Sequence, residues 1–351
     1  MSGAAERGKL GGVVRDFLDG LPPAVAETVR AAAVPHAFDA EVLGAVLDME
    51  AAEAERACGT LREMPFVQAM GDRRYALHEM VRDFLLDELW RERREDYRAW
   101  SRRAAEHFEG DDQDASRLEA AYHWLVAEPE RGADLVWNWG AEWNNTFQYE
   151  WVESLVQLGL EHEGAGRLGG RARGWILFRK GQTHVRYSEN REALASLEAG
   201  LEAGRGDRQL EANCIQALGD VHRMVAEYGA ARERYEEALP LYRAIGDRLG
   251  EANCIYRLGD VHRMVDEYEA ARERYEEALP LYRAIGARLG EANCIQALGD
   301  VQLSLDEYAA ARERYEEALG MYESFFPADH RDVKEVRKKL EEVERERGKG
   351  E

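Results

Sequence analysis

The chain of 351 residues lacks any long apolar run, and no segment approaches the about 20 uninterrupted apolar residues that a membrane helix needs. Its N-terminus has no apolar core of the kind that signal peptides carry. Basic residues are also too few, since 47 Lys and Arg face 69 Asp and Glu and leave a net charge of −22. Such a charge repels nucleic-acid backbones and anionic membranes. We therefore expect a cytoplasmic protein with no nucleic-acid partner and no membrane partner.

Cysteine is scarce, and the usual signatures of catalysis and metal binding are missing. Three of the four cysteines, Cys214, Cys254 and Cys294, recur every forty residues, and the fourth is Cys58. Stacked helices lie about 8–10 Å apart, whereas a disulfide needs Cα atoms within about 7 Å. We expect these residues to be small buried thiols in a reducing compartment. Without a paired-cysteine metal spacing, a nucleophile elbow or an HExxH motif, the sequence predicts no enzyme, no metal and no cofactor in this chain.

One apparent nucleotide motif is rejected. Gly3 to Lys9 has the GxxxxGK spacing of a phosphate-binding loop, but Leu10 stands where Ser or Thr must hold magnesium. The chain also begins too close to this segment for a strand to precede it. We interpret the match as chance and expect no nucleotide hydrolysis.

What the sequence has in abundance is internal repetition. Residues 211–250 and 251–290 differ at only five positions, and a third copy runs from Glu291 to about Leu319. Self-similarity at this period is typical of solenoids, in which each unit buries its apolar face against its neighbours. Because solenoids present long grooves, binding is the function that this pattern favours.

Each copy predicts two helices. The first helix carries an apolar face at three-to-four spacing, formed by Ile215, Leu218, His222 and Val225. Gly219 on the same helix lets a second helix approach closely, and that helix presents Ala231, Tyr235 and Ala238. Gly246 is expected to end the second helix, and Asp247 or Glu251 to begin the next one.

This order of residues resembles the tetratricopeptide repeat in a long form. Leu218-Gly219, Ala231, Tyr235 and Ala238 match its packing positions, and so do their equivalents forty and eighty residues later. An older unit is indicated by Gly181, Ala193, Leu197 and Leu201. Arg331 to Arg347 reads as a charged helix that caps the open end of the stack.

In tetratricopeptide proteins the polar side of the first helices lines a concave surface that binds peptides or partner helices. The candidate partner-binding residues are Asn213, Gln216, Asp220, Arg223, Asn253, Tyr256, Arg257, Asp260, Arg263, Asn293, Gln296 and Asp300. Two of the five differences between the first copies, Gln216/Tyr256 and Ala217/Arg257, fall on or beside this face. Either the copies drifted after duplication, or the groove is tuned. A tuned groove predicts that Tyr256, Arg257 and Arg263 are exposed together as anchors, because Tyr and Arg dominate binding hot spots.

Residues 21–90 lack the forty-residue repeat, and their pattern of helices and a hairpin predicts a winged helix. Pro22-Pro23 is expected to open a helix that runs through Ala33, and Phe38-Asp39 to lead into a second helix, which carries Val42, Leu43, Val46 and Leu47. A third helix is expected from Ala51 to Met64, followed by a hairpin at Gly71-Asp72. A long helix then begins near His78, with Met80, Val81, Phe84, Leu85 and Leu89 on its core side. The helix that would read DNA carries Glu50, Glu53, Glu55 and Glu63, so phosphate anchoring is disfavoured.

Arg74 to Leu89 resembles the end of the winged-helix domain of STAND signalling ATPases, the class that includes NB-ARC proteins. In that family a Met-His-Asp motif places a histidine against ADP phosphates, and the matching residues here are Leu77-His78-Glu79. The resemblance implies that His78 contacts ADP or ATP held by a nucleotide domain elsewhere in a longer parent protein. The alternative is that His78 only caps the long helix, with its ring packed under the hairpin.

Residues 91–168 are expected to be helical throughout. Trp137, Trp139, Trp143 and Trp151 lie close together in this segment. An aromatic cage for a ligand is one interpretation. Core packing of irregular helices is the one we favour, since buried aromatics usually serve the core.

Together these features predict an all-α protein with a small winged helix, a tetratricopeptide α-solenoid and a C-terminal capping helix. The expected segments are a leader (1–20), the winged helix (21–90), a helical connector (91–168), the solenoid (169–326) and the cap with its tail (327–351). The resemblance implies the sensor module of a STAND-type switch, in which the repeats bind a protein or peptide trigger and the winged helix relays to the nucleotide domain. A stand-alone scaffold and a DNA-binding regulator are the alternatives.

Overall fold

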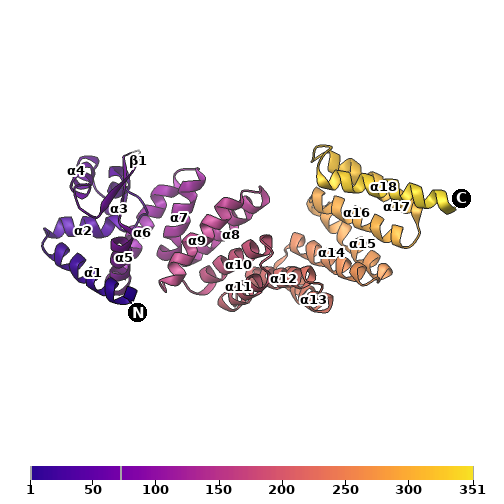
Figure 1. Cartoon of the computed structure of the whole chain (residues 1–351), viewed down its shortest axis with the longest axis horizontal. Coiled ribbons are helices and arrows are strands. Elements are labelled where there is room, and N and C mark those ends of the chain that lie inside the picture. Colours follow the sequence, from indigo (N-terminus) through magenta and orange to yellow (C-terminus); the bar gives the residue numbers. More distant parts are fainter. Residues whose placement is uncertain (1, 72, 351) are drawn as a thin grey trace. The chain divides into compact units, whose positions relative to one another are not determined.

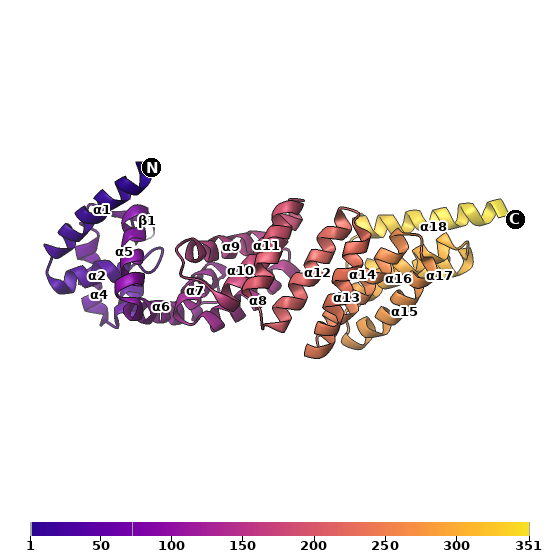
Figure 2. The ribbon, with the colours of Figure 1, turned by 90° about the horizontal axis from the view of Figure 1, so that it is seen from below.

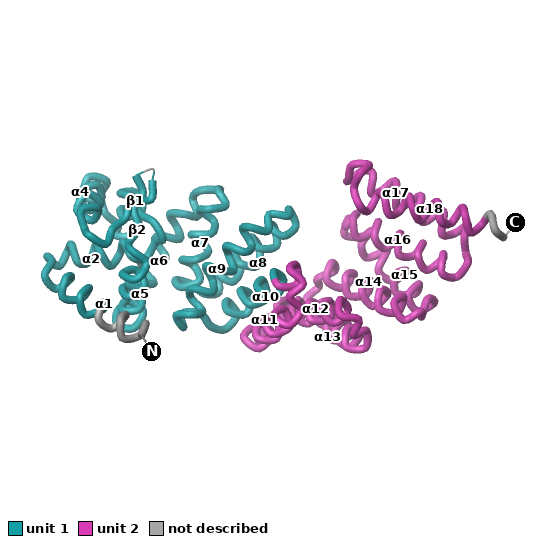
Figure 3. The backbone as a smooth tube through the Cα atoms, in the orientation of Figure 1, with its two compact units in different colours: residues 1–183 teal, residues 184–351 magenta. Residues whose placement is uncertain are grey.

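The computed structural model describes residues 2–71 and 73–350, with the side chains of residues 11–71 and 73–347. It is built almost wholly of helices and forms two compact units, residues 1–183 and 184–351 (Figures 1 and 3). The predicted all-α class, with repeats and a winged helix, is confirmed.

The first unit opens with the winged helix and continues into the connector. Its elements are α1 (Ser2–Asp19), α2 (Pro23–Ala32), α3 (Ala40–Leu47), α4 (Ala51–Leu61), β1 (Val67–Gly71), β2 (Arg74–Leu77), α5 (Glu79–Glu92), α6 (Arg94–Glu109), α7 (Asp114–Ala127), α8 (Pro129–Asn145), α9 (Tyr149–Gly164) and most of α10 (Gly170–Arg186). The strands pair antiparallel with Val67 opposite Leu77. This is the predicted hairpin, although Asp72 at its tip lies outside the described residues.

The winged helix has one core, to which the segment expected as a leader also contributes. Val14 and Leu18 of α1 are buried there, and the Phe17 ring meets Phe66 edge to face at 5.3 Å. On α5 the prediction was wrong for Met80, which is 44 % exposed. The helix begins at Glu79, and its core face is formed by residues four apart. These are Val81, Leu85 and Leu89, which are all buried.

Tryptophans of the connector pack into its core. Trp143 is buried, and its Nε1 donates a hydrogen bond of 2.7 Å to Asp114. Trp137 packs instead against Trp175, with ring centroids 4.6 Å apart. Trp139 and Trp151 each lie next to the buried Trp143, with ring centroids 6.4 Å apart, so this ring fills the space between them as core packing predicts.

The second unit is a stack of helical hairpins closed by one further helix (Figures 1 and 2). Its elements are α11 (Asn190–Ala203), α12 (Arg208–Met224), α13 (Tyr228–Ile245), α14 (Arg248–Met264), α15 (Tyr268–Ile285), α16 (Arg288–Ser304), α17 (Tyr308–Glu323) and α18 (Arg331–Gly350). Val333, Val336 and Val343 of α18 are buried in the same core as the repeats. Capping of the stack by this helix is therefore confirmed.

Small residues let the helices of each hairpin meet. Ala231, Ala271 and Ala311 are fully buried, as their spacing predicted. A Cβ on Gly219 would lie 2.7 Å from the ring of Tyr235, so the tyrosine occupies the space that the glycine leaves. Val225 is a correction, because it lies just beyond the end of α12 and is 40 % exposed.

The helix starts differ between the copies. Asp207 accepts hydrogen bonds from the backbone of Gln209 and Leu210, and Asp247 accepts one of 2.8 Å from Gly250. Ala287 holds the same position before α16 and makes no side-chain cap.

Replacing Ala287 with Asp should therefore raise the free energy of unfolding by about 0.5–2 kcal/mol, since it restores an N-cap. Ala287 and Asp247 have similar backbone angles, with φ of −78° and −76°, so no rearrangement is needed. Urea denaturation measures the effect. Ala287→Asn should retain most of the gain and Ala287→Leu none; equal stability of the Asp and Leu variants would exclude the cap as its origin.

Candidate binding face of the repeats

Two tyrosines on the second helix of each repeat are hydrogen-bonded to the polar side of the first helix. One set donates to aspartates at 2.8 Å each: Tyr235 to Asp220, Tyr275 to Asp260 and Tyr315 to Asp300. The other donates to asparagines at 2.7, 2.8 and 2.6 Å: Tyr242 to Asn213, Tyr282 to Asn253 and Tyr322 to Asn293. Burial raises the pKa of Tyr275 far above its usual range, so its hydroxyl stays a donor. The asparagine oxygens are therefore already engaged, and Nδ2 of Asn213 is itself buried.

Cations on this face link successive helices. Arg257 on α14 pairs with Asp220 on α12 at 2.7 Å, and Lys339 on α18 pairs with Asp300 on α16 at 2.6 Å. Arg263 lies 4.0 Å from Asp260 on its own helix. Burial raises the pKa of Asp260, although Arg257 and other nearby guanidinium groups oppose the shift. Arg257 therefore forms an ion pair between two successive repeats. The expectation that it is a freely exposed anchor is wrong.

A polar depression of about 300 Å³ opens between α14, α16 and α18. It is lined by Tyr256, Arg263, Asn293, Gln296, Ala297, Asp300, Tyr322, Arg331, Asp332 and Glu335. Ala297 occupies the position that Arg257 has in the preceding repeat. Because alanine has no long side chain to fill this space, the substitution helps to explain why the depression lies at the third repeat.

Only part of the predicted set surrounds this depression. Tyr256, Arg263, Asn293, Gln296 and Asp300 line it. Those lying elsewhere are Asn213, Gln216, Asp220, Arg223, Asn253, Arg257 and Asp260. Full exposure of Tyr256 was also a wrong expectation: its ring is half-buried, with centroids 5.4 Å from Tyr275 and 6.5 Å from Tyr282. A large ring on a helix surface covers its apolar area by lying against neighbouring rings.

His78 immediately precedes α5 and is exposed. Its backbone N–H donates to Phe66 at 2.7 Å, and its side chain makes no capping hydrogen bond. Packing of the ring under the hairpin is therefore a wrong expectation. Contact between His78 and a nucleotide stays a prediction.

A partly buried ionic cluster, which the sequence did not indicate, joins the winged helix to the connector. His36, between α2 and α3, pairs through Nδ1 with Glu119 on α7 at 2.9 Å and through Nε2 with Glu161 on α9 at 3.3 Å. Arg82 on α5 donates a hydrogen bond of 3.0 Å to the Tyr122 hydroxyl. These contacts connect residues 83 and 125 positions apart, so no local spacing reveals them.

The charges in this cluster are interdependent. Burial alone would lower the pKa of His36, but the Glu119 carboxylate outweighs it and the pKa is raised. Burial opposes ionisation of Glu119 too, yet His36 and His123 hold its pKa far below the usual range. His162 is fully buried, and this burial lowers its pKa well below 6.5. The cluster therefore contains a His36–Glu119 ion pair next to His162, whose burial favours the neutral imidazole.

Other chemistry is not evident in the part of the chain that the structure describes. Among those residues, no His, Cys, Asp and Glu side chains gather as a metal site, and no helix is apolar and long enough to cross a bilayer. Glu50, Glu53 and Glu55 at the start of α4 are exposed, so this surface is acidic as expected.

Two protein-family models match the chain. Residues 14–97 match the MalT winged helix domain, and residues 208–284 and 251–324 match the tetratricopeptide repeat. The chain joins a winged helix to tetratricopeptide repeats. No curated protein matches it.

Three solved structures to which the chain is similar are the following. BtubC from P. vanneervenii is 17 % identical, with a TM-score of 0.47, and the match covers 70 % of this chain and 85 % of that one. The apo form of RapI is 17 % identical, with a TM-score of 0.49 and coverages of 78 % and 67 %. A STAND protein with a tetratricopeptide repeat sensor from Pyrococcus horikoshii is 15 % identical, with a TM-score of 0.47; the match covers 96 % of this chain but 58 % of that protein.

Proposed function

We propose that the chain is a protein- or peptide-binding sensor module of a STAND-type switch. The repeats bind a trigger at the polar depression between α14, α16 and α18. The winged helix relays this event to a nucleotide-binding domain in a longer parent protein. The observation that carries the binding role is the depression, whose side chains are already held in place.

Preorganisation supports this site. The Tyr322 hydroxyl lies 2.6 Å from Asn293 Oδ1 and 2.9 Å from Gln296 Oε1, which orients both amides. A partner then loses less free energy in ordering these side chains than it would on a mobile surface. The lining contains the guanidinium groups of Arg263 and Arg331. It also contains the carboxylates of Asp300, Asp332 and Glu335, so it offers both donors and acceptors to a peptide backbone.

Two features of the first unit support the relay. The contacts of His36 with Glu119 and Glu161 join the winged helix to the connector, as a relay through both of them requires. His78 is exposed, as contact with a nucleotide on another domain requires. A match to the MalT winged helix model and the Leu77-His78-Glu79 motif agree with this proposal. Absence of a nucleotide domain from the parent coding sequence would favour the stand-alone scaffold.

Peptides selected from a random display library with the full chain should bind the depression. Substituting Gln296 with Ala should weaken their binding about tenfold, because a buried hydrogen-bonding contact is worth about 1–1.5 kcal/mol. Fluorescence anisotropy with the selected peptides measures this change.

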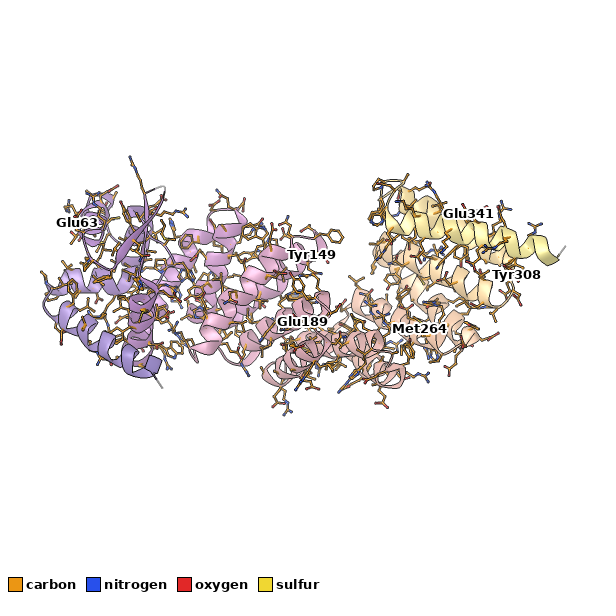
Figure 4. The ribbon with its side chains drawn as sticks, in the orientation of Figure 1. Glu63, Tyr149, Glu189, Met264, Tyr308 and Glu341 are labelled. Atoms are coloured by element: carbon orange, nitrogen blue, oxygen red, sulfur yellow. The ribbon has the colours of Figure 1, made fainter. Side chains whose placement is uncertain are left out.

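Met264→Ala is the matched control, because Met264 is exposed near the end of α14 and does not line the depression (Figure 4). It should leave affinity unchanged. If the selected peptides bind wild type and the Gln296 and Tyr256→Ala variants equally, the depression is not the binding site.

A further inference from the structure

An arginine closes each junction between the near-identical repeats. At the end of α13, Arg243 reaches Glu251 on α14 at 2.8 Å and Glu277 on α15 at 3.0 Å. At the end of α15, Arg283 likewise reaches Glu291 at 2.8 Å and Glu317 at 3.2 Å. The same guanidinium clamp thus occurs twice, each time between two carboxylates of the following repeat.

The junction before the first full repeat has both carboxylates, but the arginine that lines it, Arg205, pairs with Glu202 and not with them. Glu211 and Glu237 stand forty residues before Glu251 and Glu277, whereas Ala203 stands forty residues before Arg243. The helix that would carry the arginine, α11, has 14 residues, against 18 in α13 and in α15. Its last turn is therefore missing.

A cavity of about 520 Å³ lies at this junction, between α11, α12 and α13. Its apolar side chains are Leu201, Ile215, Leu218 and Leu241. Its charged side chains are Glu198, Glu202, Glu211, Glu237, Arg205 and Arg234, so acidic groups exceed basic ones by four to two. An aliphatic surface edged with excess carboxylates complements a segment that is both cationic and apolar.

The contacts that Glu211 and Glu237 already make do not obstruct such a ligand. Glu211 accepts a hydrogen bond of 2.8 Å from the backbone of Gly206 at Oε1, which leaves its other oxygen for an arginine. Arg234 lies 2.9 Å from Glu237. In the next repeat, Arg274 pairs with Glu277 at 2.8 Å while Arg243 contacts the same carboxylate. Glu277 at the filled junction thus binds two guanidinium groups at once. Glu237 holds the same repeat position, so it has room for a second one beside Arg234.

We propose that this cavity binds an arginine-bearing apolar segment of a partner protein, which docks as the last turn of α13 docks on the next repeat. The arginine bridges Glu211 and Glu237, and a neighbouring aliphatic side chain covers Leu201 and Leu241. A guanidinium group can bridge two carboxylates through its planar fork of donors, which an ammonium group cannot reproduce. This site shares no residue with the polar depression, and the proposal stands independently of the trigger's identity.

The chain itself supplies a probe. A labelled peptide with the sequence of residues 238–246, Ala-Leu-Pro-Leu-Tyr-Arg-Ala-Ile-Gly, carries Arg243 and Ile245. It should bind the full chain in fluorescence anisotropy. The same peptide with citrulline in place of arginine keeps the shape without the charge, and it should bind at least fivefold more weakly.

The protein is then varied at the cavity. Glu211→Gln combined with Glu237→Gln should weaken binding of the arginine peptide at least fivefold, whereas Glu233→Gln, an exposed site on α13 outside the cavity, should not. Circular dichroism checks that the variants are folded. If the double variant unfolds, the citrulline comparison on the unaltered chain decides. No binding of the arginine peptide, equal binding of both peptides, or undiminished binding by the folded double variant would overturn the proposal.

Discussion

Replacing Glu119 with Ala should lower the free energy of unfolding of the first unit by about 1–3 kcal/mol. The pair with His36 is partly buried, so the cost lies between that of a surface pair and that of a fully buried one. His36 would lose its contact of 2.9 Å and keep only the weaker pairing with Glu161 at 3.3 Å. The fully buried His123, whose Nε2 lies 3.6 Å from Glu119, would lose its carboxylate as well.

Tryptophan fluorescence during urea denaturation isolates this effect. All eight tryptophans precede residue 184 and so report on the first unit alone. Glu150→Ala, at an exposed position on α9, is the control and should change stability little. A loss below about 1 kcal/mol for Glu119→Ala, typical of a surface pair, would mean that the cluster does not hold the winged helix to the connector.

The same one-carbon change should have opposite effects at two helical glycines of the second unit. A Cβ on Gly259 would lie 2.6 Å from the Tyr275 ring, whereas a Cβ on Gly320 would meet nothing within 4 Å. Gly320→Ala should stabilise the protein by about 1 kcal/mol through helix propensity. Gly259→Ala should instead destabilise it, because overpacking typically costs about 1–3 kcal/mol and exceeds the gain in propensity.

Tyr275 cannot easily move aside. It is fully buried, its hydroxyl is bonded to Asp260 at 2.8 Å, and the Tyr256 ring lies against it. Thermal unfolding followed by circular dichroism measures both variants. If Gly259→Ala proves as stabilising as Gly320→Ala, the tyrosine does not depend on the missing side chain for its place.

The hairpins of the repeats could be predicted because their packing is local. Gly219, Ala231 and Tyr235 lie within 17 residues of one another, and helical periodicity places them on facing surfaces. Position on a face did not predict exposure. Tyr256 was assigned to the groove side, but its degree of burial depends on Tyr275 and Tyr282, which reach it from α15.

Periodicity alone determined that this chain forms stacked helical pairs, because a forty-residue repeat specifies the same neighbours again and again. The tertiary structure decided which polar groups are free. Arg257 looked like an anchor until Asp220, on the preceding first helix, proved to be 2.7 Å away. His36 carried no signal until Glu119 and Glu161 met it across 83 and 125 residues. Ion pairs and cavities depend on distances between side chains far apart in the chain, and helical spacing constrains only side chains that are near one another in sequence.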